Sequence, residues 1–170
     1  LVLDVFLDYQ ALKDARVIPT VAYQRTGVAL ALRPDLGPVH RLEDLPPETR
    51  TAALVRSHAQ MFLDQKGLQV IPFGFEDEML EAVARGEVDA AAASPASIGW
   101  YNHRHPDRPL ALLPLFEQEP ALAWSLAVGM RRSDKDFRRE VDKIVRAMLE
   151  DGTVARIYAA YGVEHRRPAP

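Results

Sequence analysis

His103 and His105 are the residues whose types and spacing most directly suggest chemistry. Imidazoles two positions apart on an extended segment can bind one metal ion. The sequence offers no evident third ligand, and Arg104 between the two histidines disfavours a nearby cation. An exposed loop is therefore the favoured interpretation of this pair.

A group of acidic residues could instead supply general acid–base catalysis. The group stands at the start of a predicted helix, where the positive end of the helix dipole by itself accounts for acidic side chains. A solvated helix face is the favoured interpretation of the group, which consists of Glu76, Asp77, Glu78 and Glu81.

The sequence contains no other pattern typical of catalysis. It has no glycine-rich phosphate loop, no nucleophile elbow and no metalloprotease histidine pair. Hydrogen bonding and helix capping account for the serines, which are Ser57, Ser94, Ser97, Ser125 and Ser133. We therefore expect that the protein is not an enzyme and carries no cofactor.

Composition narrows the possible partners. The 170 residues, 48% hydrophobic and 26% charged, suffice for one domain or two small lobes. A net charge of -3 spread along the chain argues against nucleic acid or an anionic membrane as a partner. The absence of cysteine excludes disulfides and thiolate metal sites. No run approaches the roughly 20 apolar residues that cross a bilayer, and no leader is recognised at the start. A globular monomer is expected.

The order of predicted elements indicates crossover units on a parallel sheet. The alanine run at 88–94 has the propensity of a helix, but its place between a helix and a second helix start favours a strand. Strands or extended segments are predicted at 2–8, 27–33, 51–57, 68–73, 88–94, 110–116 and 122–131. Helices are predicted at 58–66, with its end marked by Gly67, and at 75–85, with Gly86 just past its end. Further helices are predicted from near Pro95 over 96–104, from Ser133 with a capping-box-like Asp136, and from Thr153 to Tyr161.

Such sheets bind ligands beyond the carboxyl ends of their strands, where helix N-termini present N–H donors. Three predicted strand ends qualify, at 56–58, 73–75 and 94–96. Arginine and backbone N–H groups there could hold an anion. Trp100 or Tyr101 could stack on a ligand ring, or could only pack the helix against the sheet.

Five sequence segments carry a family resemblance. They are LDVFLD at 3–8, RLEDLP at 41–46, EMLEAVARGEVDAAAAS at 78–94, SLAVGMRRSDKDF at 125–137 and MLEDGTVARIYAAYGV at 148–163. With these segments the chain resembles the type II periplasmic solute-binding proteins, in particular the family 3 group that mostly binds amino acids for ABC transporters. The resemblance implies a periplasmic protein and a membrane permease as partner.

The same resemblance implies a two-lobed α/β fold that lacks the first strand-helix-strand-helix block. Residues 1–33 and 118–170 are expected to form one, incomplete lobe. Residues 34–117 are expected to form the other lobe.

The resemblance also implies which residues bind the ligand. Arg16 is expected to hold a ligand carboxylate, twelve positions after the acid of the LDV segment. Ser57 and His58 stand in place of a glycine–threonine turn that supplies amide donors. Ser94 stands where the family has the acid that pairs with an amino group. Without that carboxylate a buried ammonium lacks its charge partner, so an ordinary amino-acid ligand is disfavoured.

A narrower resemblance concerns DAAAASPASIGWY, AVGMRRSD and the terminal YGVEHRRPAP. These segments are similar to solute-binding-like proteins that accompany periplasmic quinoprotein (PQQ) methanol and alcohol dehydrogenases. A planar, polyacidic quinone cofactor would suit Arg16, Arg56, His58 and Trp100 through charge-assisted hydrogen bonds and stacking.

Two hypotheses follow. In the first, the protein binds a small polar or anionic molecule between its lobes. In the second, it is an accessory protein that activates a quinoprotein methanol dehydrogenase without a tightly bound small ligand. An enzyme such as a dehydratase would need a carboxylate at a strand end of the site, and the strand-end residues include none.

Overall fold

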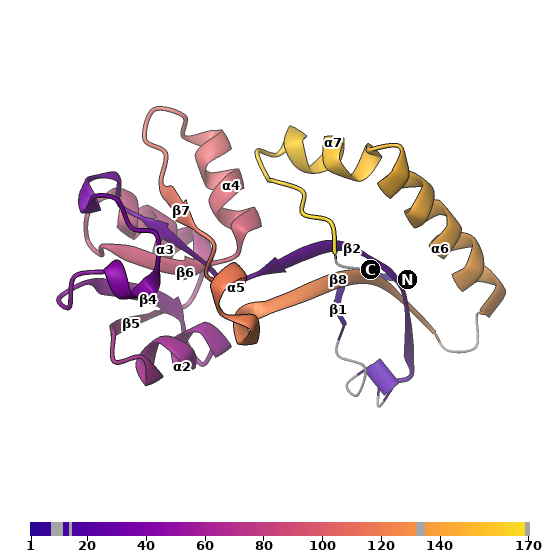
Figure 1. The fold of residues 1–170 in the computed structure, drawn as a ribbon, viewed down its shortest axis with the longest axis horizontal. Helices are drawn as coiled ribbons and strands as arrows, with labels where there is room; N and C mark the ends of the chain where they lie inside the picture. Colours follow the sequence, from indigo (N-terminus) through magenta and orange to yellow (C-terminus); the bar gives the residue numbers. More distant parts are fainter. Residues whose placement is uncertain (8–11, 14, 132–134, 169–170) are drawn as a thin grey trace. The chain divides into compact units, whose positions relative to one another are not determined.

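The structure, a computed structural model, describes residues 1–7, 12–13, 15–131 and 135–168. The chain forms two compact units, coloured by sequence in Figure 1. Unit 1 comprises residues 1–26, 124–160 and 164–170, and unit 2 comprises residues 27–123 and 161–163. The lobe boundaries expected after residues 33 and 117 stay a prediction.

Unit 2 is built on a five-stranded sheet, and its strand order is β5-β4-β6-β3-β7. The strands are β3 (Ala29–Leu32), β4 (Arg50–Leu54), β5 (Gln69–Phe73), β6 (Ala90–Ala93) and β7 (Ala111–Leu113). β4 pairs in parallel with β5 and β6, whereas β3 pairs antiparallel with both β6 and β7. The predicted parallel crossover units are thus confirmed for β4, β5 and β6. β3 runs antiparallel because no crossover helix precedes it and the chain enters it almost directly from another strand.

Helices connect these strands close to their predicted positions. They are α2 (His58–Gln65), α3 (Glu76–Ala84), α4 (Pro95–Arg104) and the short α5 (Leu115–Gln118), with single 3-10 turns at Pro34–Leu36, Leu42–Asp44 and Pro120–Leu122. The extended segment predicted at 110–116 is correct only for β7, since the chain turns into α5 after Pro114. Because β5 and β6 flank β4 on opposite sides, right-handed crossovers place α2 and α3 on opposite faces of the sheet.

The alanine strand β6 lies in the middle of this sheet. None of its four residues is more than 4% exposed. Ala91 and Ala93 contribute to the cluster formed by Met79 and Val83 of α3 and Ile98 of α4. The prediction of a strand is therefore confirmed: sheet pairing and burial override the helical propensity of alanine.

Unit 1 contains a three-stranded sheet with the order β1-β8-β2. Its elements are β1 (Val2–Phe6), β2 (Val17–Gly27), β8 (Ala123–Arg131), α6 (Lys135–Glu150) and α7 (Thr153–Ala160). The predicted start of α6 at Ser133 lies outside the described residues. Thr153 does not cap α7 as predicted but is its first residue, and the Asp151 carboxylate accepts the Thr153 N–H at 2.8 Å.

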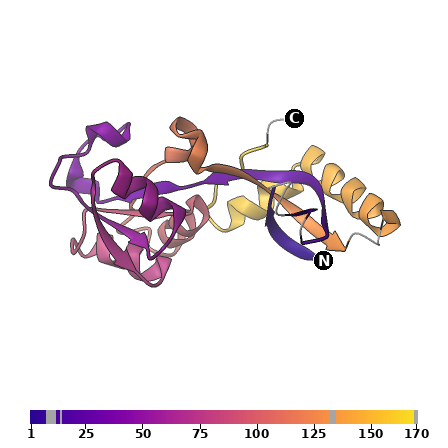
Figure 2. The ribbon, with the colours of Figure 1, turned by 90° about the horizontal axis from the view of Figure 1, so that it is seen from below.

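The free edge of β2, a strand that the sequence analysis did not predict, is covered by polar side chains and backbone. Asp142 of α6 accepts the Val21 N–H at 2.6 Å, and the Arg25 N–H donates to the Arg166 carbonyl at 2.8 Å. Figures 1 and 2 both show α6 running along this sheet. Covering an edge in this way satisfies backbone groups that could otherwise pair with another chain.

Among the described residues, no helix combines the length and apolar character that crossing a membrane requires.

An ion-pair network joins β4 to the turn before β6, at the end of the strands opposite to their carboxyl ends. The Asp89 carboxylate accepts hydrogen bonds from the Arg50 backbone N–H at 2.9 Å and from its side chain at 3.0 and 3.1 Å. Arg33 adds a weaker contact at 3.4 Å. These hydrogen bonds hold the pKa of Asp89 below its usual value, against the opposing effect of burial.

Replacing Asp89 should destabilise unit 2 in a pH-dependent way. We expect Asp89→Asn to lower the free energy of unfolding by about 1–2 kcal/mol near neutral pH, because partly exposed donors of Arg50 lose a charged acceptor. The depressed pKa means that the carboxylate stabilises the fold fully above about pH 4 and progressively less as the pH falls through the folded-state pKa. Urea unfolding of both proteins should therefore show a smaller difference near pH 3, and an equal difference at both pH values would contradict the assignment.

Candidate functional site

The strand order of unit 2 reverses between β4 and β6. From β4 the chain goes to β5 on one side, and from β5 it crosses to β6 on the other side of β4. β4 and β6 run in register, with Ala53 beside Ala92, so their carboxyl ends lie at the same edge of the sheet. Ligands of open α/β sheets bind at such a switch point. The carboxyl ends of β4 and β6 are therefore the candidate site.

The turn after β4 forms one side of this switch point. Ser57 caps α2, since its hydroxyl accepts the Gln60 N–H at 3.0 Å. The Gln60 side chain in turn accepts the Arg56 N–H at 2.7 Å and holds Arg56 in a left-handed conformation with φ of 60°. Such a backbone is costly for a non-glycine residue and is often kept at functional sites. Arg56 and His58 are exposed beside the α2 N-terminus.

The turn after β6 forms the other side. Ser94 caps α4, because its hydroxyl accepts the Ser97 N–H at 3.0 Å, and Pro95 is the first helical residue as predicted. The Ser94 and Ser97 hydroxyls lie 2.8 Å apart. The N-termini of α2 and α4 thus follow neighbouring strands at one edge of the sheet.

A carboxylate also reaches this edge. Glu76, the first residue of α3, accepts hydrogen bonds from the Ser94 N–H at 3.3 Å, from the Ser94 hydroxyl at 3.4 Å and from the Ser97 hydroxyl. The interpretation of Glu76 as part of a solvated face is therefore wrong. So is the expectation that no carboxylate lies at a strand end of the site. The acid comes from the helix that crosses the sheet, 18 residues before Ser94, so no local pattern reveals the contact.

A groove of about 470 Å³ runs between α3 and α4 from this carboxylate. Its lining includes Glu76, Asp77, Glu81, Trp100, Tyr101 and Arg104. Trp100 is 41% exposed, whereas Tyr101 is only 7% exposed and belongs to the core cluster. Of the two roles considered for these aromatic residues, Tyr101 packs the helix against the sheet and Trp100 faces the groove.

The Trp100 indole lies among other planar groups. The ring centroids of His103 and Tyr161 are each 5.6 Å from that of Trp100, and the Arg104 guanidinium carbon lies 5.7 Å from it. A guanidinium over an indole is a cation–π contact. The wall of the groove is thus an aromatic surface that already has a cation at its outer end.

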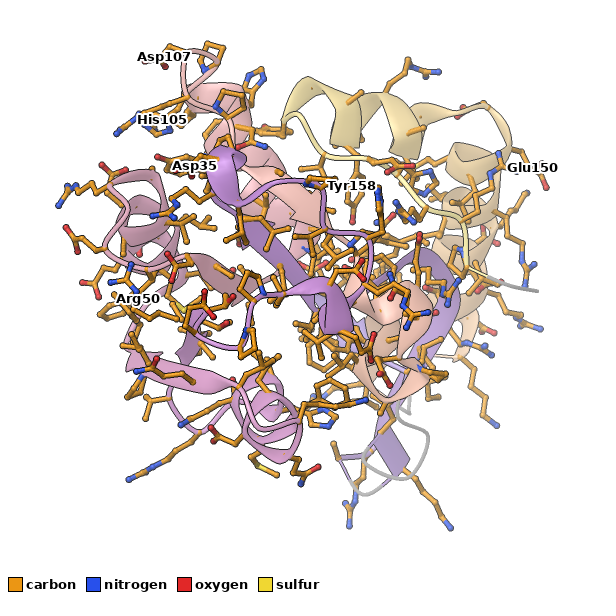
Figure 3. The ribbon with its side chains drawn as sticks, turned by 60° about the vertical axis from the view of Figure 1, so that its left-hand side comes forward. Asp35, Arg50, His105, Asp107, Glu150 and Tyr158 are labelled. Carbon is orange, nitrogen blue, oxygen red and sulfur yellow. The ribbon has the colours of Figure 1, made fainter. Side chains whose placement is uncertain are left out.

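The sequence interpretation of the pair as a loop is wrong for His103 but not for His105, which follows the last helical residue. His103 belongs to α4, because the helix continues to Arg104, and His105 follows as its C-cap (Figure 3). The His103 ring stacks on Trp100, whereas the His105 ring packs on Tyr101 at 4.3 Å. Among the described residues, no three histidine or acidic side chains are grouped as metal ligands.

Glu81, deeper in the groove, is already neutralised. It accepts a hydrogen bond from Tyr101 at 3.1 Å and pairs with Arg108 at 3.2 Å and Arg85 at 3.3 Å. Partial burial raises the pKa of Glu81, but the hydrogen bond from Tyr101 and the two arginine charges together lower it below its usual value. Burial and the neighbouring carboxylate raise the pKa of Tyr101.

The predicted ligand-binding residues separate into three places. Arg56, Ser57, His58 and Ser94 lie at the switch point of unit 2, and Trp100 lies in the groove beside it. Arg16 belongs to unit 1, where it is exposed and has a left-handed φ of 55°. The role of each of these residues in binding stays a prediction.

A doubly wound sheet whose helix N-termini meet at a switch point, in a chain that also forms a second unit with its own sheet, is the architecture of the periplasmic-binding-protein fold. Solved structures support this fold. The chain is similar to the periplasmic binding protein XoxJ from Methylobacterium extorquens AM1, with 18% identity, a TM-score of 0.71, and coverage of 89% of this chain and 74% of XoxJ.

Two further structures agree. An ancestral cationic amino-acid solute-binding protein, AncCDT-1, has 16% identity and a TM-score of 0.76 over 94% of this chain and 67% of its own. The GluR0 ligand-binding core from Nostoc punctiforme, in complex with L-glutamate, has 14% identity and a TM-score of 0.63 over 93% of this chain and 70% of its own. The fold is therefore that of the type II periplasmic binding proteins, as the sequence resemblance predicted, and part of the fold in those proteins has no counterpart in these 170 residues.

Sequence comparison adds less. No family model matches the chain. A membrane-bound lytic murein transglycosylase F from Desulfosudis oleivorans is 34% identical over 86 residues, which are 50% of this chain and 17% of that protein. The matched part is thus a small fraction of the relative's length.

The position of Trp100 should depend on close packing at Gly99. A Cβ at this position would lie 2.6 Å from the Gly162 carbonyl oxygen, so Gly99→Ala should displace residues 161–163 and with them the ring of Tyr161. We expect a red-shifted Trp100 emission and a loss of about 1–3 kcal/mol of stability. The measurement uses a Trp124→Phe background, which leaves Trp100 as the remaining tryptophan.

Gly74→Ala is the matched control, because a Cβ there would have no neighbour within 4 Å. It should leave both the emission and the stability unchanged. The same emission from both variants would contradict the packing described for Trp100.

Proposed function

We propose that the chain is part of a non-catalytic periplasmic solute-binding protein that binds a small polar or anionic molecule at the switch point of unit 2. The observation that carries the proposal is the meeting of the α2 and α4 N-termini, with the exposed Arg56, at the adjoining ends of β4 and β6. The N-terminus of α2 and an arginine fork are suited to an anionic group, and the Ser94 hydroxyl at the start of α4 is suited to a polar group of the same molecule.

The details of this proposal rest on several residues. Arg56, Ser57 and His58 would hold the anionic group, and Ser94 would bind from the opposite side of the switch point. Arg16, a residue of unit 1, is proposed to bind a ligand carboxylate. A planar quinone cofactor is one ligand that fits this chemistry, because it could also stack on the exposed Trp100.

The structural neighbours support binding rather than catalysis. XoxJ is a binding protein, AncCDT-1 is a solute-binding protein for cationic amino acids, and the GluR0 core is a ligand-binding unit. By analogy with solute-binding proteins, we propose that the partner of the complete protein is the permease of an ABC transporter. The lytic transglycosylase match is too small a part of that enzyme to transfer its activity.

The second candidate is an accessory role for a quinoprotein methanol dehydrogenase. It is supported by the narrower sequence resemblance and by Ser94 in place of the acid that relatives use. Co-purification with the dehydrogenase and a change in its activity on addition of this protein would support this role. An unchanged activity and no co-purification would count against it.

Calorimetry tests the binding proposal directly. The protein is titrated with amino acids, aromatic carboxylates such as phthalate, and pyrroloquinoline quinone. We expect at least one anionic compound to bind more tightly than millimolar, and Arg56→Gln to weaken that binding about tenfold through the loss of a charge-assisted contact. Arg85→Gln is the control, because Arg85 caps the C-terminal end of α3. The absence of any binding tighter than millimolar would refute the proposal.

A further inference from the structure

We infer that the groove between α3 and α4 binds an organic cation, with its ammonium or guanidinium group at Glu76 and its apolar body along Trp100. The inference rests on the proposed solute-binding function, because Ser94 and Trp100 belong to the site proposed there. It adds a chemical class of ligand to the half of that site that lies beside α4.

The Glu76 end of the groove has acidic side chains without a positively charged partner in the described part of the chain. The donors to the Glu76 carboxylate are one backbone amide and two hydroxyls, all of them neutral. Asp77, next to it in the lining, is exposed and accepts only the Glu78 N–H at 3.0 Å. Neither carboxylate forms an ion pair with any residue in the described part of the chain. The Glu76 end of the groove therefore carries negative charge that a ligand cation would neutralise.

The Glu76 carboxylate is held in place by neighbouring residues. Three hydrogen bonds to the first turn of α4 fix the carboxylate, and Glu76 itself is only partly exposed. A surface glutamate that is free to rotate would lose side-chain entropy on binding a cation, and a fixed one loses less. The other acidic residue deeper in the groove, Glu81, is already paired with Arg85 and Arg108.

The size and the aromatic surface of the groove also suit an organic cation. Its volume of about 470 Å³ lies in the range of small-molecule sites. The Trp100 indole is 41% exposed, and the Arg104 guanidinium carbon lies 5.7 Å from its ring centroid. Aromatic faces attract ammonium and guanidinium groups through their quadrupole. A cationic head with an apolar body matches the carboxylate and the indole together.

Fluorescence of Trp100 in the Trp124→Phe protein tests the inference. The probes are 2-phenylethylammonium and its anionic counterpart 3-phenylpropanoate. We expect the cation to change the emission saturably and the anion to bind at least tenfold more weakly. Glu76→Gln should weaken cation binding about tenfold, because it removes the charge and keeps a hydrogen-bond acceptor. Glu78→Gln, the same change two residues further along α3 and outside the groove lining, should leave cation binding unchanged.

Equal binding of cation and anion by the unmodified groove would overturn the inference, and this comparison needs no variant that could fail to fold. So would cation binding that Glu76→Gln and Glu78→Gln alter equally. A lysine-containing pentapeptide, Ala-Ala-Lys-Ala-Ala amide, is titrated in parallel: tighter binding of this peptide would identify a protein side chain as the source of the cation, and tighter binding of the free amine a small solute.

The same proteins separate this inference from the proposed function. Phthalate binding that depends on Arg56 but no cation binding that depends on Glu76 would refute the inference alone. Cation binding that depends on Glu76, without any anion binding that depends on Arg56, would refute the anion site alone and leave the groove in place.

Discussion

The small side chains of β6 are the constraint on which the rest of unit 2 depends. Four consecutive alanines, buried on both faces, leave room for helices to lie close to the sheet. α3 and α4 pack on the face that Ala91 and Ala93 present. At this close approach the first residue of α3 reaches the cap of α4, and the Glu76–Ser94 contact forms. Larger residues in β6 would separate the two layers and break that contact.

The resulting edge of the sheet has two electrostatic characters. On the side of β4, Arg56 and the N-terminus of α2 attract anions. On the side of β6, the full negative charge of the Glu76 carboxylate exceeds the partial positive charge of the α4 N-terminus beside it, so this side attracts cations instead. A solute with both charges, or two solutes of opposite charge, would complement the whole edge. The family resemblance of the sequence alone suggested that the part of the site that binds an amino group had been lost, because Ser94 replaces the acid of the family. The structure shows a carboxylate supplied from a different element.

The helix ends, the helix caps and the alanine strand could be predicted from the sequence, because they depend on local patterns. Helix ends were marked by Gly67 and Gly86, and the caps by Ser57 and Ser94, because capping is a property of a few adjacent residues. The alanine strand was predicted from its neighbours in the chain. The type II fold was predicted from sequence segments in the expected order, and the solved structures confirm it.

The features that the sequence analysis missed are long-range. The direction of β3 depends on how the chain enters unit 2, and the residues of β3 carry no sign of it. The histidine pair was interpreted as a loop because His-x-His was considered as an extended pattern, whereas His103 lies within α4 and its ring contacts Trp100 of the same helix. Glu76 was interpreted together with the acidic residues next to it in the sequence, although its hydrogen-bond partners lie 18 and 21 residues away.

The central claim is that the switch point between β4 and β6 is the place where this protein binds its ligand. Amide chemical shifts of the isotope-labelled protein, followed during titration with a compound that calorimetry shows to bind, test it most directly. The account predicts that the largest shifts fall on Arg56, Ser57 and His58 and on Ser94 and Ser97, the residues around the two helix N-termini. Shifts confined to other parts of the chain, such as β7 and α5, would contradict it.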